Sequence, residues 1–111
     1  MHRPSRLSFA LLLTLLAACG QPVPPEKAAY VGLWQAPQMA LLITADGNVR
    51  YQRKEGNTTT KVNGPLQGFE ADNFKVGVGP LSTTFVVTAP PHADGEGMKM
   101  TVDGVELSKA P

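Results

Sequence analysis

The segment Met98-Lys99-Met100-Thr101-Val102-Asp103-Gly104-Val105-Glu106-Leu107 decides the fold of this chain. Its apolar residues recur at every second position, which is the period of a β-strand with one buried face. Asp103-Gly104 is a two-residue turn of the kind that joins antiparallel strands, because both residue types tolerate positive φ angles. Val102 and Val105 flank the turn and should face each other on one side of the ribbon. The segment therefore predicts a β-hairpin.

The same period of two runs through the rest of the chain from Tyr30 onward. Turn residues separate the alternating segments, and Asn63-Gly64-Pro65 is expected to break one strand from the next. Before the hairpin, segments with a strand-like pattern begin near Tyr30 and continue at residues 39–44, 49–52, 58–62, 66–70, 74–78 and 83–88. The pattern predicts an all-β antiparallel meander of seven to eight short strands.

A meander of this length must hide its edges, which favours a closed or nearly closed barrel over an open sheet. Glycines at 32, 68, 77 and 79 would supply the bends that closure requires. A two-sheet sandwich is the alternative. A domain this small should fill its interior with side chains rather than enclose a ligand cavity.

The start of the predicted domain carries Gly32-Leu33-Trp34, a Gly-x-Trp motif. This motif resembles the entry of lipocalins and related calycin barrels. The resemblance implies that Trp34 plugs one end of the barrel and that a late arginine packs over it. No arginine follows Arg53 here, and lipocalins are considerably longer. The alternative is that Trp34 is the largest anchor of an ordinary small core.

Residues 1–18 have the three parts of an export signal. Arg3 and Arg6 precede an apolar run that ends in the small residues Ala17 and Ala18. The run from Leu7 is too short for a membrane span, which needs about 20 apolar residues. We expect a cleaved signal helix that sends the chain out of the cytoplasm.

Leu16-Ala17-Ala18-Cys19 resembles the lipobox of bacterial lipoproteins. The resemblance implies that the Cys19 sulfur receives a diacylglycerol, that cleavage occurs before Cys19, and that a further fatty acid such as palmitate is added to the amine. Cys19 would then be a membrane anchor, and Gly20 after it favours the outer membrane, facing the periplasm, in a Gram-negative host. An ordinary secretory signal is the alternative, but it would leave a lone free thiol in an oxidising compartment.

Residues 19–29 contain Pro22, Pro24 and Pro25 and are expected to form an extended tether. Such a segment would lift the domain of residues 30–111 up to roughly 30 Å from the lipid.

Charge excludes one class of partner. Without Arg3 and Arg6 the chain has eight Lys or Arg residues against nine Asp or Glu residues, a formal charge of −1. No basic face argues for nucleic acid, so we expect no nucleic-acid partner.

Residues 89–97 form the longest segment without strand period and contain His92, Asp94 and Glu96 at alternate positions. These three residues are the candidates for contact with a ligand or partner, and a metal or general-base role is conceivable for them. The mature chain has no second histidine and no further cysteine, so we expect no metal and no cofactor. Solvated loop charges are the alternative interpretation.

No serine lies in a Gly-x-Ser-x-Gly elbow, and nothing selects a carboxylate pair from the acidic residues. The leading hypothesis is a non-enzymatic lipoprotein of the cell envelope, whose β-domain binds a protein, a glycan or a small ligand. An envelope inhibitor of a lytic enzyme such as lysozyme is a second hypothesis, since lipid-anchored lysozyme inhibitors are similar in size and fold class. A carboxylate-based hydrolase is the third.

Overall fold

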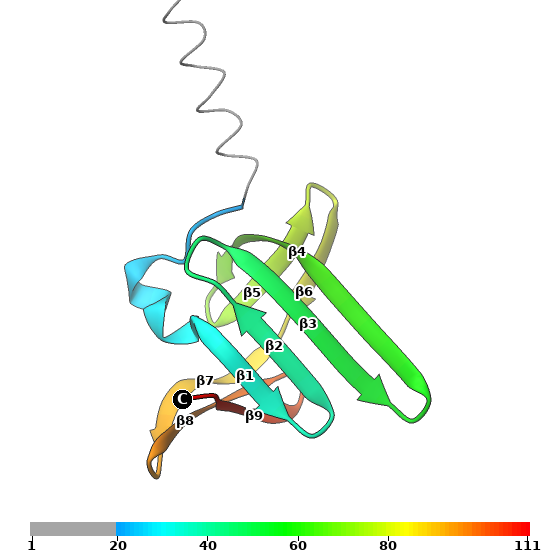
Figure 1. The fold of residues 1–111 in the computed structure, drawn as a ribbon. Helices are drawn as coiled ribbons and strands as arrows, with labels where there is room; N and C mark the ends of the chain where they lie inside the picture. Colours follow the sequence, from blue (N-terminus) through cyan, green and yellow to red (C-terminus); the bar gives the residue numbers. More distant parts are fainter. Residues whose placement is uncertain (1–19) are drawn as a thin grey trace, which may run out of the picture.

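The computed structural model describes residues 20–111, so the predicted signal peptide and the lipid attachment site at Cys19 lie outside the described residues. Within residues 20–111, one short 3-10 helix, η1 (Pro25–Tyr30), precedes nine strands (Figure 1). The strands are β1 (Gly32–Ala36), β2 (Met39–Ile43), β3 (Asn48–Glu55), β4 (Thr58–Glu70), β5 (Asn73–Val78), β6 (Leu81–Phe85), β7 (Val87–Asp94), β8 (Gly97–Val102) and β9 (Val105–Lys109).

All nine strands belong to one antiparallel sheet in the order β6-β5-β4-β3-β2-β1-β9-β8-β7. Neighbours in the sheet are neighbours in sequence, apart from the pairing of β1 with β9 that joins the two ends of the domain. The sheet curls into a half-barrel, with its two edges, β6 and β7, separated in sequence only by Val86. The all-β antiparallel meander is confirmed, as one curled sheet of nine strands rather than seven or eight.

The corner at Val86 divides one predicted strand into two. The segment 83–88 was expected to be one strand, but it contains the end of β6 and the start of β7. Phe85 and Val87 both point into the core while Val86 is exposed between them. Asp103 holds this corner, because its amide donates to the Val86 carbonyl at 2.8 Å and its Oδ1 accepts from the Val86 amide at 2.9 Å.

β4 corrects the expectation of a break at Asn63-Gly64-Pro65. The strand runs through these residues for 13 positions. It pairs with β3 as far as Pro65 and with β5 only from Leu66 onward. Gly64-Pro65 therefore marks the place where β4 changes partner, not the place where it ends.

β7 corrects the expectation of an irregular segment at residues 89–97. The strand includes Pro90 and Pro91 and continues to Asp94, leaving only a short turn before β8. β7 is an edge strand, and its register with β8 shifts between Ala89 and His92. Prolines are tolerated here because sheets accept them in edge strands and at irregularities of register, where an amide donor is not needed.

The concave side of the sheet is filled by side chains. Buried aromatic rings meet there, with Phe85 stacked on Phe74 at 5.0 Å between ring centroids and lying 4.8 Å from Tyr51. No polar or charged residue within 20–111 is buried. The buried core consists of Tyr30, Trp34, Met39, Leu41, Ile43, Val49, Tyr51, Leu66, Phe74, Val76, Phe85, Val87, Met100, Val102, Val105 and Leu107.

Trp34 is fully buried in this core. Its indole Nε1 donates a hydrogen bond to the Tyr30 carbonyl at 2.9 Å, which satisfies the one polar atom of the side chain. Lys109 Nζ lies 5.4 Å from the centroid of the Trp34 ring. A cationic side chain from late in the sequence thus lies over Trp34, but it belongs to Lys109 and not to an arginine.

The N-terminal segment from Gly20 to Tyr30 lies against the domain, which contradicts the extended tether. The Gln21 amide donates to the Leu66 carbonyl at 2.9 Å, and the Val23 amide donates to the Ala45 carbonyl at 3.0 Å. Val23 packs against the core, and the residues from Pro25 form η1. The prolines were read as excluding regular structure, but Pro24 and Pro25 instead begin a 3-10 helix, since proline suits the first helical turn.

Candidate functional site

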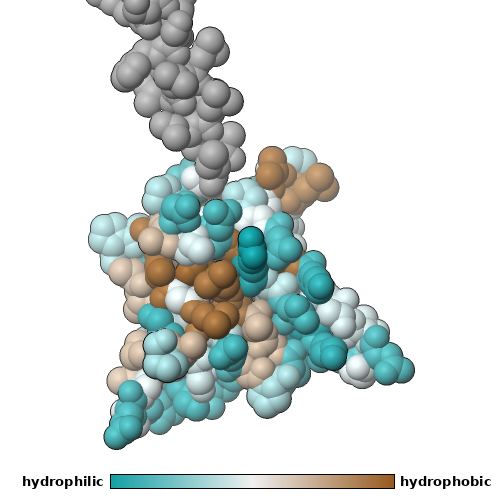
Figure 2. Space-filling model, in the orientation of Figure 1, coloured by the Kyte–Doolittle hydropathy of each residue, from teal (hydrophilic) through white to brown (hydrophobic). Residues whose placement is uncertain are grey.

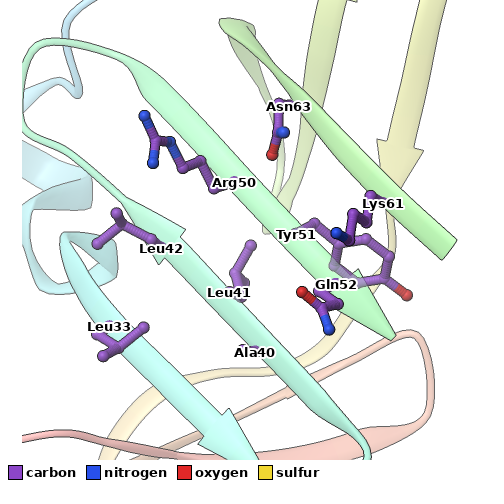
Figure 3. A pocket seen from close by; sticks show the side chains of 9 residues that line it. All are labelled: Leu33, Ala40, Leu41, Leu42, Arg50, Tyr51, Gln52, Lys61 and Asn63. Atoms are coloured by element: carbon purple, nitrogen blue, oxygen red, sulfur yellow. The ribbon is translucent and has the colours of Figure 1, made fainter. Parts of the chain in front are cut away.

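The outer surface of β1 to β4 carries a shallow depression of about 280 Å³ (Figure 3). Its floor and walls come from four adjacent strands, and its lining combines apolar, amide and cationic side chains. The residues that line it are Leu33, Ala40, Leu41, Leu42, Arg50, Tyr51, Gln52, Lys61 and Asn63, of which Leu41 and Tyr51 are buried core residues. We call this surface the outer-face site.

Strand register builds the site in two rows. In the first row Leu33 of β1 is opposite Leu42 of β2, which is opposite Arg50 of β3, which is opposite Asn63 of β4. Residues two positions apart share a face of a sheet, so a second row lies beside the first. There Ala40 of β2 is opposite Gln52 of β3, which is opposite Lys61 of β4. Antiparallel pairing thus collects side chains that are far apart in sequence.

The apolar part of the site lies over β1 and β2. The side chain of Leu33 faces away from the core, and the residue is 37% exposed although it is apolar. Ala40 is small, so it leaves a hollow beside the larger side chains of Leu42 and Gln52. Figure 2 shows the apolar residues over these two strands, bordered by hydrophilic residues over β3 and β4.

The polar part of the site is cationic. Arg50 and Lys61 line the site, and Lys54 lies beside it on the same outer face of β3. All three are exposed. The ion pairs found within residues 20–111 use the cations Lys27, Arg53, Lys75 and Lys99, and none uses these three. Their charges are therefore available to an anionic group.

His92, Asp94 and Glu96 are not brought together with this site. His92 and Asp94 belong to β7, Glu96 lies in the turn before β8, and all three are exposed. His92 Nδ1 lies 2.8 Å from the Pro90 carbonyl oxygen, so its hydrogen bond is local. Over the described range 20–111, no group of three or more His, Cys, Asp or Glu side chains is placed to share a metal ion.

Sequence reasoning missed the outer-face site, although one signal was present. Leu42 interrupts the apolar and polar alternation of residues 39–44 by placing a large apolar residue on the outward face. Leu33 does the same in β1. What the sequence did not show is that the two leucines are opposite each other.

No protein-family model, no curated protein and no solved structure matches the chain. The function must therefore be inferred from the residues and their arrangement. Within residues 20–111, none of the helical structure has both the length and the apolar character needed to cross a bilayer.

Proposed function

We propose that this protein is a cell-envelope lipoprotein, anchored by lipid on Cys19, whose β-domain binds an acidic protein partner at the outer-face site. The observation that supports binding most directly is the row Leu33, Leu42, Arg50, Asn63 across four strands. The sequence around Cys19 supports anchoring, because it has the lipobox pattern after an export signal.

The chemistry of the site favours a protein partner. Protein interfaces combine an apolar centre with a polar rim, and arginine is enriched in them. Leu33, Ala40 and Leu42 provide the apolar centre, whereas Arg50 and Lys61 provide unpaired positive charge at its side. A polypeptide that carries apolar residues next to Asp or Glu complements both halves. A heavily hydroxylated glycan would leave the leucines without a partner.

Anchoring is tested by metabolic labelling of cells with a fatty acid. We expect the wild-type protein to incorporate the label and to remain with the membrane fraction, and Cys19→Ala to lose both properties. Mass spectrometry of the mature N-terminus should find Cys19 first and acylated. An unlabelled wild-type protein would contradict the anchor.

Binding is tested by placing a photo-crosslinking amino acid at position 42 in intact cells. We expect a discrete crosslinked protein, and we expect Arg50→Glu together with Lys61→Glu to abolish it by charge repulsion. The matched control is the same crosslinker at Thr84, an exposed position on β6. Equal crosslinking from positions 42 and 84, or no crosslinking from position 42, would contradict the proposed binding at the outer-face site.

The inhibitor hypothesis is tested with the same charge variant. The processed protein is added to lysozyme, and lysozyme activity should be unchanged if the partner is not such an enzyme. Inhibition that disappears in the Arg50→Glu and Lys61→Glu variant would instead identify a lytic enzyme as the partner.

A further inference from the structure

The turn between β5 and β6 exposes two large apolar side chains. Val78 is 68% exposed and Leu81 is 82% exposed, the highest values among the large apolar residues within 20–111. The two residues pair across the turn formed by Gly79 and Pro80. Val78 continues the alternation of the buried residues Phe74 and Val76, but it lies at the end of the hairpin, beyond the core. We call residues 78–81 the apolar tip.

The apolar tip lies beside the start of the described chain. Gly20 and Gln21 line the same surface depression as Gly77, Val78 and Gly79. Figure 1 shows the β5–β6 turn at the same end of the molecule as the first described residues, and Figure 2 shows apolar side chains at that turn. The residue that precedes Gly20 in sequence is Cys19.

Gly20 packs closely against the domain, so its position relative to the apolar tip is fixed. A Cβ atom added at Gly20 would lie 2.7 Å from the Gly47 carbonyl oxygen, which shows how closely the backbone approaches the β2–β3 turn. The next residue, Gln21, is hydrogen-bonded to Leu66 of β4. Since consecutive Cα atoms are 3.8 Å apart, a lipid on Cys19 would bring the bilayer surface close to this end of the domain.

The apolar tip is uncharged, and close contacts hold its backbone. Residues 76–84 contain no charged side chain, so no acidic group opposes a membrane surface there. Gln67 Nε2 donates to the Gly79 carbonyl at 3.1 Å. The backbone at Gly77 packs so closely that an added Cβ would lie 2.2 Å from the Leu81 carbonyl oxygen. A turn whose backbone is held by such contacts has less conformational entropy to lose when it is buried.

We propose that the apolar tip enters the interfacial layer of the bilayer beside the lipid on Cys19, so that the domain contacts the membrane at two points. This inference rests on the proposed anchoring. A lipid surface fits better than a second protein, because the tip is next to the anchor and away from the charged outer-face site. Transfer of the two side chains out of water supplies the driving force.

The experiment uses the full chain, processed in cells, purified with its lipid and reconstituted into phosphatidylcholine vesicles whose acyl chains are brominated. Bromine quenches tryptophan fluorescence at short range. Leu81→Trp places a tryptophan on the tip, and its high exposure in the wild type makes the substitution compatible with folding. The matched control is Val86→Trp, because Val86 is also exposed and follows the opposite end of β6.

We expect quenching of Leu81→Trp, relative to unbrominated vesicles, to exceed that of Val86→Trp. Trp34 is buried and contributes the same background to each variant. Adding Val78→Asp to Leu81→Trp is expected to reduce the quenching, because a charge opposes entry into the bilayer. Equal quenching of the Leu81 and Val86 variants would overturn the inference.

Fatty-acid labelling of the same preparations distinguishes failure of the apolar-tip proposal from failure of the proposed lipid anchor. A labelled protein without selective quenching at position 81 would overturn the apolar tip alone and leave the anchor standing. A protein without label would overturn the anchor and, with it, the inference that depends on it.

Discussion

Gly47 is the residue that lets the N-terminal segment pack on the domain. It has a φ of +93°, and an added Cβ would lie 2.1 Å from the Gln21 carbonyl oxygen. The Leu66 amide donates to the Gly47 carbonyl at 2.8 Å, next to the bond from Gln21 to Leu66. One absent side chain therefore allows three segments to meet.

We predict that Gly47→Ala destabilises the protein more than Gly56→Ala. Both glycines have positive φ, but nothing lies within 4 Å of an added Cβ at Gly56, so that control carries only the conformational cost, roughly 1–2 kcal/mol. Gly47→Ala should lose about 1 kcal/mol more for each hydrogen bond that the clash breaks. Urea unfolding of both variants measures the difference. Equal free energies of unfolding would show that the clash is relieved without loss.

Tyr30 links stability to alkaline pH. Burial, and secondly the negative charge of Asp72, raise the pKa of Tyr30 to about 12 from 10.0. The hydroxyl donates to the Asp72 carbonyl at 2.8 Å, and a phenolate cannot make this bond. Between pH 10 and 12 the unfolded chain releases this proton while the folded chain keeps it, so stability falls as the pH rises. Below pH 10 the contribution of the neutral phenol is fully present.

The prediction is that Tyr30→Phe loses less stability than the wild type between pH 10 and 12. The two proteins share every other titrating group within the domain, so the difference between their urea midpoints across this range isolates Tyr30. If the urea midpoints of the wild type and Tyr30→Phe fall in parallel between pH 10 and 12, the Tyr30 phenol ionises in the folded protein as easily as in the unfolded chain.

At the scale of elements, the strand period alone predicted how β2 is buried. Met39, Leu41 and Ile43 are buried, and the residues between them are not. The continuity of β4 was not predictable in this way, because Gly64-Pro65 is a local break signal and only the change of partner from β3 to β5 overrides it. The outer-face site was hidden for a related reason, since it depends on register across four strands.

β7 is an edge strand whose two adjacent prolines lack the amide donors that strand pairing uses. Exposed edges invite pairing with other chains, and proline is one way to prevent it. We predict that Pro90→Thr with Pro91→Thr increases self-association at equal protein concentration, measured by light scattering after size-exclusion chromatography. Pro37→Thr, in the β1–β2 turn, is the control and should not. A double variant that associates no more than this control would show that the edge is protected by other means.

The folded unit as a whole begins before Tyr30. Residue patterns placed the boundary at 30 because prolines dominate the preceding segment. Docking of that segment depends on contacts with Ala45 and Leu66, which are distant in sequence and leave no local signal.

We therefore predict that residues 30–111 are less stable than residues 20–111. The shorter chain loses the packing of Val23 against the core and the amide bonds of Gln21 and Val23. Together these contribute roughly 2–4 kcal/mol. Urea unfolding of the two chains measures the loss, and coincident transitions would mean that residues 20–29 add nothing.

The docked N-terminal segment, residues 20–30, also limits how far the domain can move from the proposed lipid anchor. A domain on a long flexible linker samples a wide range of heights above its membrane, whereas Gln21 of this chain is already hydrogen-bonded to β4 and leaves little such freedom after it. With the proposed anchor, we expect a partner of the outer-face site to meet the domain close to the bilayer surface.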